Sequence, residues 1–185
     1  DLKDKIFYDN SGGGITLSGG EPLYQYDFSL ELLKMAKANG LHTAIETCGV
    51  TSADKIRAIS EYVDLYLFDY KETNPELHKK YTGVSSDLIL ANLSVLNSIG
   101  KRVILRCPII PGCNNRKEHF DGICRVANQF DSVLHIEIEP YHPLGEGKYL
   151  SLGLAEHKYH SPCKLEMEML LAEISANTDK KVVFA

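Results

Sequence analysis

A glycine-rich loop with an acidic residue is the first stretch of this sequence that could bind a polar ligand. Gly19-Gly20-Glu21-Pro22 follows a predicted strand and precedes a predicted helix. Two glycines let a ligand approach the backbone closely, so the amides and carbonyls of this loop could bind its polar ends. The alternative for the same residues is an ordinary strand-to-helix turn.

An acid and a base follow another strand at a spacing of two. Asp69 and Lys71 flank Tyr70, so both side chains can point to the same side of the chain. Together they could bind a zwitterionic ligand, with Lys71 on a carboxylate and Asp69 on a hydroxyl or ammonium group. A mutual ion pair at the surface is the alternative.

Arg106 and His142 are further candidates. Arg106 is flanked by apolar strand residues and therefore needs an anionic partner, which is either a core carboxylate or a ligand. His142 follows Pro140-Tyr141, and a lone histidine is more often structural than a ligand contact.

The sequence offers no nucleophile of its own. It lacks a G-x-S-x-G elbow, and its five cysteines have no CxxC or CxxxCxxC spacing. Neither a disulfide framework nor a metal site is therefore expected, and the thiols are interpreted as reduced, cytosolic and packed as small hydrophobes. We assign no catalytic residue and no metal ligand, so catalysis is left to a cofactor. The cysteines are Cys48, Cys107, Cys113, Cys124 and Cys163.

Composition narrows the class of protein. The 185 residues are 44% hydrophobic and 24% charged, the balance of a soluble globular protein. The length favours a single domain that comprises residues 1–185. A net charge of −5 with no basic run argues against a nucleic-acid partner. Short, interrupted apolar runs argue against a membrane span, and no signal peptide is recognised at the first residue.

These residues must be positioned by five β-branched or aliphatic runs, each followed by helical periodicity. Strands that alternate with helices indicate parallel βαβ units and an α/β fold. The predicted strands are Gly14–Ser18, His42–Thr47, Val63–Asp69, Arg102–Cys107 and Val133–Glu139, with a sixth possible at Val182–Phe184.

Helix signals lie between the strands. Phe28, Leu32 and Met35 are expected to form the inward face of the first helix, with Asp27 as its cap. A last helix is expected from Ser161-Pro162 to about Ala176. The other expected caps are Ser52, Asn74 and Asn115, the last in a capping box with Glu118.

The strand ends favour a barrel over an open doubly wound sheet. Ionisable groups lie at or near the ends of all five strands, as in a (β/α) barrel, whereas a doubly wound sheet gathers ligand groups at one switch point. A complete barrel needs about 250 residues, so a partial, TIM-like barrel is expected here, with the first βα unit missing.

The fifth strand indicates an open interior. Its polar residues His135, Glu137 and Glu139 alternate with the aliphatic residues Leu134, Ile136 and Ile138. The aliphatic row should face the outer helices. A row of histidine and glutamate would be costly in a sealed core, so the other face should line a wet cleft.

Taken together, these motifs resemble the radical S-adenosylmethionine (SAM) activating enzymes of glycyl-radical enzymes, the family of pyruvate formate-lyase activating enzyme. The resemblance spans residues 11–153 in order. It rests on the segments around Gly19-Gly20-Glu21, Glu46-Thr47-Cys48-Gly49, Asp69-Tyr70-Lys71, Arg106-Cys107-Pro108 and Pro140-Tyr141-His142.

The resemblance implies a partial barrel that binds SAM across the strand ends beside a [4Fe-4S] cluster held by a CxxxCxxC motif. Reductive cleavage of SAM there gives a 5′-deoxyadenosyl radical, which takes hydrogen from a glycine of a partner glycyl-radical enzyme. An electron donor such as flavodoxin or ferredoxin, and a cytoplasmic location, are further implications.

Site roles also follow from the resemblance. Gly19, Gly20 and Glu21 should line the methionine amino group of SAM. Asp69 and Lys71 should contact its ribose and carboxylate region, and His142 its ribose and adenine side. The pocket should be framed by Glu46, Thr47 and Arg106.

Two departures qualify the resemblance. The CxxxCxxC motif is absent from this sequence, so this chain alone is expected to lack cluster and activity. Glu139 stands where the family usually has an aliphatic residue near the cofactor. The alternatives are a radical SAM enzyme acting on a small molecule and a silent barrel acting as a binding module; the identity of the glycyl-radical enzyme stays open.

Overall fold

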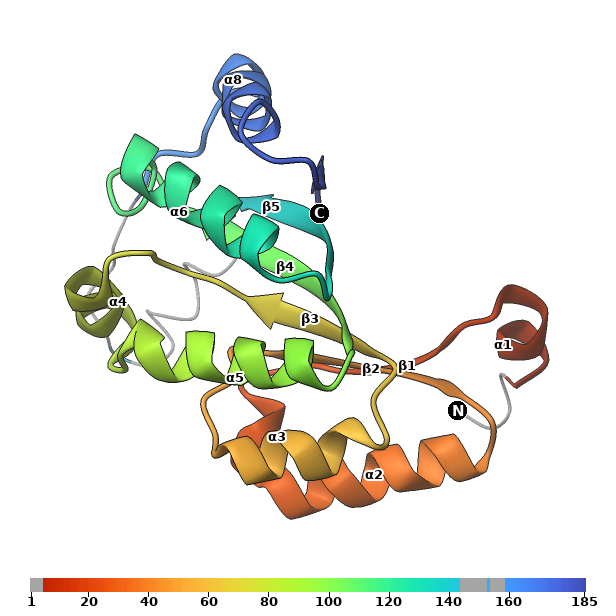
Figure 1. Ribbon diagram of the computed structural model, residues 1–185. Helices are drawn as coiled ribbons and strands as arrows, with labels where there is room; N and C mark the ends of the chain where they lie inside the picture. Colours follow the sequence, from red (N-terminus) through yellow and green to blue (C-terminus); the bar gives the residue numbers. More distant parts are fainter. Residues whose placement is uncertain (1–4, 144–152, 154–158) are drawn as a thin grey trace.

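One parallel sheet organises the chain (Figure 1). The structure, a computed structural model, describes residues 5–143, 153 and 159–185. The sheet has six strands in the order β1-β2-β3-β4-β5-β6, and each neighbouring pair is parallel. The strands are β1 (Gly14–Leu17), β2 (His42–Thr47), β3 (Leu65–Asp69), β4 (Arg102–Ile109), β5 (Val133–Pro140) and β6 (Lys181–Phe184).

The strand order confirms the barrel-type prediction. Because spatial order follows sequence order throughout, this sheet has no switch point of the kind that defines a doubly wound fold. Strands β1 and β6 do not pair with each other, so the described sheet is open, as a partial barrel should be. A preceding βα unit stays a prediction.

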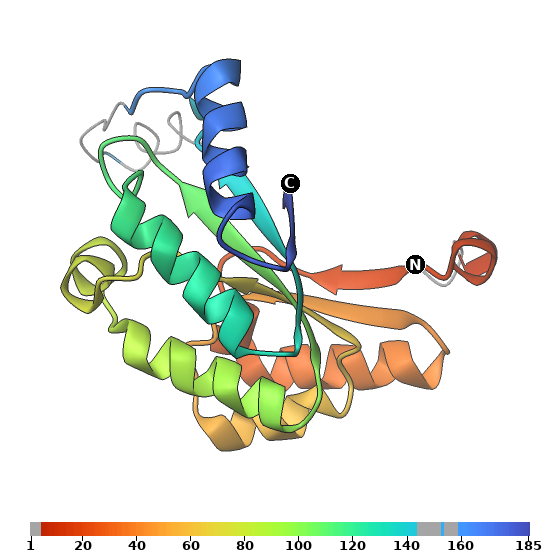
Figure 2. The same ribbon diagram turned by 45° about the horizontal axis from the view of Figure 1, so that its top comes forward.

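Helices cover one face of the sheet. In both ribbon views α2, α3, α5 and α6 follow one another along the same side of the strands, whereas α1 stands apart (Figures 1 and 2). The helices are α1 (Lys5–Ser11), the 3₁₀ helix η2 (Pro22–Gln25), α2 (Tyr26–Ala38), α3 (Ala53–Ser60), α4 (Pro75–Thr82), α5 (Ser86–Ser98), α6 (Lys117–Gln129) and α8 (Lys164–Ser175).

The core lies between the sheet and these helices. Along β4, Val103, Leu105 and Cys107 are fully buried while Arg106 faces the opposite side, because successive strand residues alternate between faces. We call that opposite side the lumen face. The core is completed by helix residues that include Leu33, Ile56, Ile59, Ile89, Leu93, Leu96 and Ile123.

The predicted helix caps are partly confirmed. Ser52 and Asn74 accept hydrogen bonds from the first turns of α3 and α4. The predictions of Asp27 and Asn115 as caps are wrong. The 3₁₀ helix η2 leads directly into α2, with Gln25 at the N-cap position. Arg116 precedes α6 and its side chain makes no capping hydrogen bond. The last helix begins at Lys164, three residues after Ser161.

The predicted inward face of α2 is wrong. Phe28 and Met35 are exposed, at 67% and 63%, and Leu32 is half-buried. Ser29 donates a hydrogen bond of 2.7 Å to the carbonyl of Pro22, and this contact turns a different stripe of the helix toward the sheet. The buried residues of that stripe are Ser29, Leu33 and Ala36.

A bulge shifts the phase of β5. Val133 pairs with Val103, but the next pair is His135 with Ile104, so Leu134 is an extra residue. Leu134 is 41% exposed and does not face the helices as predicted, because a bulge breaks strict alternation. Beyond it, Ile136 and Ile138 are buried, which confirms the rest of the aliphatic row.

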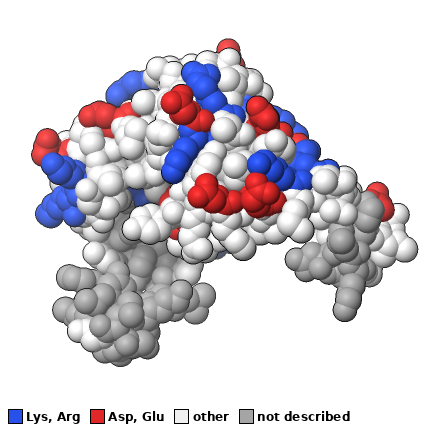
Figure 3. All heavy atoms as spheres, turned by 90° about the horizontal axis from the view of Figure 1, so that it is seen from below, with Lys and Arg blue, Asp and Glu red and all other residues white. Residues whose placement is uncertain are grey.

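Charges of both signs are mixed over the face that α2, α3 and α5 cover, as Figure 3 shows from below. This pattern differs from the single-signed basic surface of a nucleic-acid-binding protein. Within the described ranges, no helix combines the length and the apolar character that crossing a bilayer requires.

Asp64 ties three elements together at the amino ends of the strands. Its Oδ2 accepts hydrogen bonds from the amide of Thr43 at 2.8 Å and from the Thr43 hydroxyl at 3.0 Å, and Nζ of Lys37 lies 2.8 Å from its Oδ1. Burial raises the pKa of this carboxyl, but the hydrogen bonds from Lys37 and Thr43 outweigh burial and hold the pKa below its ordinary value.

We predict that Asp64→Asn lowers the free energy of unfolding at pH 7 by about 1–2 kcal/mol, since a charge-assisted network is lost. A depressed folded-state pKa gives stability above the unfolded pKa and loses it as the pH falls through the folded pKa. The difference between wild type and variant in urea melts should therefore shrink below about pH 4.

The matched control is Asp131→Asn, which changes an exposed aspartate in the turn before β5. It should leave the melts unchanged at every pH. A destabilisation by Asp64→Asn that stays constant from pH 7 to pH 3 would contradict the role given to the ionised carboxylate.

Candidate functional site

The carboxylate of Glu21 fastens the glycine loop to the end of β2. Its Oε1 accepts hydrogen bonds from the Thr47 hydroxyl at 2.6 Å and the Leu23 amide at 3.0 Å. Its Oε2 accepts from the amide and the thiol of Cys48, at 2.8 and 2.9 Å. Both oxygens are thus occupied by protein donors, so Glu21 positions the loop.

The backbone of Gly19 and Gly20 is left exposed by this arrangement. Gly19 has a φ of +98°, in the region that favours glycine. A Cβ atom built on either glycine would meet nothing within 4 Å. The loop therefore presents bare amides and carbonyls to open space, which suits a ligand that must come close to the main chain.

Cys48 is a donor and a poor nucleophile. Burial, together with the hydrogen bond to the Glu21 carboxylate and the charge of that group, raises the pKa of the thiol to about 11. Since the thiolate is the reactive form, Cys48 stays protonated near neutral pH. Its function in this site is to hold Glu21.

Arg106 is the centre of an ion cluster on the lumen face. Its Nη1 lies 2.8 Å from Oε1 of Glu46 on β2, its Nε lies 3.5 Å from Oε2 of Glu137, and its Nη2 contacts Glu139. Glu46 also accepts a hydrogen bond of 2.8 Å from the Ser18 hydroxyl beyond β1. The cluster thus links the ends of β1, β2, β4 and β5.

Carboxylates outnumber cations on this face. Among the described residues here, four acidic side chains surround the cations Lys71 and Arg106, and Nε2 of His135 lies 3.2 Å from Oε1 of Glu137. The surplus of negative charge favours a ligand that carries positive charge. The acidic residues are Glu46, Asp69, Glu137 and Glu139.

Asp69 and Lys71 contact each other. Nζ of Lys71 lies 3.1 Å from Oδ2 of Asp69, and the two side chains are 40% and 17% exposed. Burial is the largest influence on Asp69 and raises its pKa; Lys71 and Arg106 lower it, and the net direction is upward. The ion pair therefore does not fully offset the cost of desolvating Asp69.

Hollows open beside the strand ends. One of about 300 Å³ is lined by Gly19, Gly20 and Glu21 among others. A second, of about 490 Å³, includes Arg106 and the exposed His142 in its wall. Their volumes fall at the size of small-ligand sites.

The structure brings most of the predicted site residues together by direct contact. The linked pairs are Glu21 with Thr47, Glu46 with Arg106 and Asp69 with Lys71. Gly19 and Gly20 adjoin the first pair in the chain, and His142 joins the group only through the hollow it shares with Arg106. Ligand contact by these residues stays a prediction.

The sequence did not predict the contacts of three residues at the site. Glu137 and Glu139 were predicted to face the interior, but not to surround Arg106, and Cys48 was predicted to be inert packing. The i, i+2 spacing of the two glutamates beside a strand that carries an arginine is a signal that could have found them. No local signal points from Cys48 to Glu21, because the two are 27 residues apart.

The donor set decides which cofactors fit. Across the described part of the chain, no group of three or more histidine, cysteine, aspartate or glutamate residues is arranged to hold a metal ion. These residues therefore do not fit an iron–sulfur cluster, which is held by cysteine thiolates. The exposed glycine backbone and the surplus of carboxylates do fit a ligand such as SAM, which carries an ammonium, a sulfonium and a carboxylate.

Curated relatives match about four fifths of the chain. The chain is 38% identical over 154 residues to the choline trimethylamine-lyase activating enzyme of Oleidesulfovibrio alaskensis, covering 82% of this chain and 50% of the relative. It is 38% identical over 159 residues to the pyruvate formate-lyase-activating enzyme of Streptococcus mutans, covering 83% and 60%. The chain thus spans about half the length of the curated relatives it matches.

Solved structures share the fold. A domain of a pyruvate-formate lyase-activating enzyme from Bacteroides vulgatus superposes with a TM-score of 0.78 at 21% identity, covering 94% of this chain and 99% of that one. Streptococcus suis SuiB bound to S-adenosylmethionine superposes with a TM-score of 0.73 at 13% identity, covering 93% and 39%.

The match at the level of the superfamily covers more than half of the sequence. Residues 3–123 match the Radical SAM superfamily, a range that contains β1 to β4, the first half of α6 and the contacts around Glu21. Members of this superfamily use SAM together with a [4Fe-4S] cluster. With the sequential parallel sheet and the charged lumen face in place, the chain belongs to the Radical SAM superfamily.

Proposed function

We propose that the complete protein is an activating enzyme that generates a glycyl radical on a partner enzyme. The observation that carries this proposal is that curated relatives 38–41% identical over about four fifths of the chain are activating enzymes. They include activating enzymes for choline trimethylamine-lyase, trans-4-hydroxy-L-proline dehydratase and isethionate sulfite-lyase. Pyruvate formate-lyase is a further partner of this kind.

In this proposal the chain's own residues bind and orient SAM. The exposed backbone of Gly19 and Gly20 receives the methionine ammonium, and Lys71 receives the carboxylate. Asp69 lies at the ribose side, and His142 at the adenine side of the hollow that it shares with Arg106. The surplus of carboxylates around Arg106 stabilises the positive charge of the sulfonium.

A [4Fe-4S] cluster, when bound to the complete protein, would supply the electron that cleaves SAM. No residue described in the structure is assigned to it, and the residues named above act only in binding SAM and excluding water. Flavodoxin or ferredoxin is the electron donor in this proposal, and the cytoplasm is where the reaction occurs.

The function is tested with the complete protein, reconstituted anaerobically and mixed with SAM, a reductant and a candidate glycyl-radical enzyme. A glycyl-radical signal in electron paramagnetic resonance is expected on one partner. A partner whose radical glycine is replaced by alanine serves as the control and should give no signal. Absence of the signal with every glycyl-radical enzyme of the source organism would contradict the proposal.

We predict that Lys71→Ala in the complete protein weakens SAM binding by about ten- to a hundredfold. A charge-assisted hydrogen bond to the ligand carboxylate contributes about 1.5–3 kcal/mol, and each 1.4 kcal/mol is tenfold in affinity. The melting temperature should barely change, because the partly exposed pair with Asp69 contributes about 0–1 kcal/mol. Calorimetric titration with SAM measures the first effect and thermal melting the second.

Lys79→Ala, on the exposed side of α4, is the matched control and should leave both quantities unchanged. A drop of several degrees in melting temperature with unaltered SAM affinity would show that Lys71 has a structural role and that its assignment to the site is wrong.

Asp69→Asn should change the free energy of unfolding in the opposite direction to Asp64→Asn. Since the folded-state pKa of Asp69 is raised by burial, the ionised carboxylate opposes folding increasingly as the pH rises from the unfolded to the folded pKa. The variant should therefore gain stability relative to wild type from pH 4 to pH 7, while its SAM affinity falls. Urea melts across that range test the sign, and a variant that is less stable at pH 7 than at pH 4, relative to wild type, would refute it.

This 185-residue chain, treated anaerobically with iron and sulfide, is expected not to form a stoichiometric [4Fe-4S] cluster. It lacks closely spaced cysteines, and burial holds the pKa of the Cys107 thiol well above its ordinary value. Iron analysis and visible absorbance make the measurement. A full cluster that is lost in Cys107→Ser or Cys113→Ser would overturn the expectation.

A further inference from the structure

The described main-chain hydrogen bonds between β3 and β4 end at Tyr70, one residue before Lys71. The last of them on this side runs from the amide of Tyr70 to the carbonyl of Arg106, at 2.8 Å. From Lys71 onward the chain leaves β3 and crosses to α4, which begins at Pro75. Some other interaction must therefore fix the backbone from which the Lys71 side chain extends.

The side chain of Asn114 holds that backbone from one side. Its amide group donates to the carbonyl of Lys71 at 2.8 Å and to the carbonyl of Pro108 at 2.7 Å, while its Oδ1 accepts from the Ile110 amide at 2.7 Å. Asn114 is 3% exposed, and every hydrogen-bonding group of its side chain is used. It thus ties the Lys71 main chain to the end of β4.

An ion pair holds the next residue. Glu72 is fully buried, and its Oε2 accepts from Nη1 of Arg116 at 2.9 Å while its Oε1 contacts Nη2. Arg116 also donates to the carbonyl of Cys113 at 3.0 Å, and Oε1 of Glu72 accepts from the Asn74 amide at 2.7 Å. We call Glu72, Asn114 and Arg116 the clasp.

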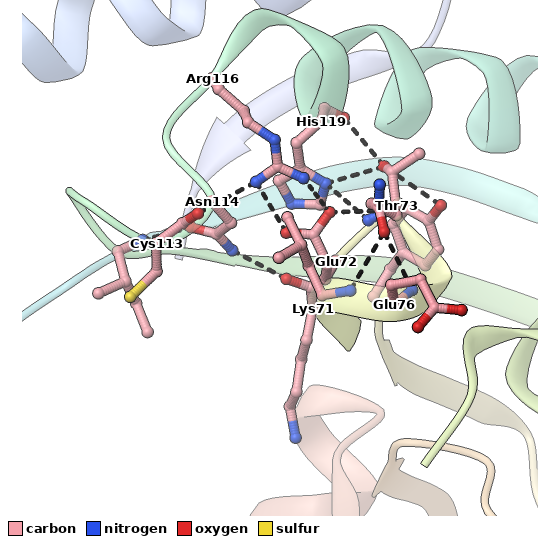
Figure 4. A network of polar contacts seen from close by, with 12 residues as sticks. Lys71, Glu72, Thr73, Glu76, Cys113, Asn114, Arg116 and His119 are labelled. Atoms are coloured by element: carbon pink, nitrogen blue, oxygen red, sulfur yellow. Dashed lines mark hydrogen bonds and ion pairs between the residues drawn. The ribbon is translucent and has the colours of Figure 1, made fainter. Parts of the chain in front are cut away.

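The clasp keeps to the main-chain side of Lys71. In Figure 4 the bond from Asn114 to the Lys71 carbonyl and the pair of Glu72 with Arg116 lie on one side, and the Lys71 side chain extends away from them. That side chain reaches Asp69 at 3.1 Å and lines a hollow of about 260 Å³ together with Glu21 and Cys48. The clasp holds the Lys71 backbone and does not contact its ammonium, which pairs with Asp69.

From this arrangement we propose that the clasp positions Lys71 for the SAM carboxylate, so that Glu72, Asn114 and Arg116 are positioning residues of the binding site. The inference rests on the proposed function, in which Lys71 contacts SAM. Its physical content is preorganisation: a lysine whose backbone is held in place loses less freedom when its side chain binds the ligand. Loosening the clasp should weaken SAM binding only through Lys71.

The test is a thermodynamic cycle in the complete, cluster-loaded protein. Glu72→Gln and Asn114→Ala are each made alone and in a Lys71→Ala background, and the dissociation constant for SAM is measured by calorimetric titration. Each is expected to weaken binding by about five- to tenfold in the wild-type background and to have no further effect once Lys71 is alanine. Non-additivity of this kind is the signature of residues that act together.

A control separates positioning from general loss of stability. Asp64→Asn breaks an ion pair at the opposite end of β3 and should lower the melting temperature without changing SAM affinity. Glu72→Gln keeps the shape of its side chain and an acceptor for Asn74, so it decides the test by itself if Asn114→Ala does not fold.

The outcomes are distinct. If Lys71→Ala weakens SAM binding but Glu72→Gln leaves the affinity at the wild-type value, or weakens it equally in both backgrounds, this inference is overturned and the proposed site stands. If Lys71→Ala leaves SAM affinity unchanged, the assignment of Lys71 to the site fails, and this inference fails with it.

Discussion

The interaction on which the site depends is the contact of one guanidinium with three carboxylates. Arg106 lies on β4 and reaches Glu46 on one side and Glu137 and Glu139 on the other. Without it, three acidic side chains would share one half-buried surface, and like charges at such distances oppose each other. The parallel register brings Arg106 and Glu137 opposite each other, so the cluster and the sheet support one another. The carboxylates that Arg106 does not neutralise are therefore held in place by the strands that carry them.

A second constraint shapes the part of the site that is neutral. Glu21 has the residue type and position of a ligand contact, yet protein donors occupy both of its oxygens. Its effect on a ligand is indirect: it keeps the Gly19-Gly20 backbone exposed and fixed against the end of β2. A site built in this way presents main-chain groups on one side and charged side chains on the other.

Much of the fold followed from local pattern, and the failures have identifiable causes. The six strands were located because β-branched runs and turn residues are local signals, and Ser52 and Asn74 were recognised as caps because a cap lies within three residues of its partners. The face of α2 was wrong because a tertiary hydrogen bond from Ser29 sets its rotation. The predicted site residues lie near the ends of the strands, and ligand binding by them stays a prediction. Their partners were not predicted, since Arg106 could be seen to need an anion but not to have three of them.

The bulge at Leu134 has a consequence for how this sequence is compared with others. It inserts a single residue after Val133, so that Val133 and Ile136 both lie in the core although three positions separate them. Strands without the bulge keep the same two faces with one residue fewer. An alignment of β5 that places no gap opposite Leu134 will therefore exchange core and lumen positions on one side of the bulge. Under such an alignment His135 and Glu137 would be matched with aliphatic positions, and a change of function would be inferred where only the phase of the strand differs.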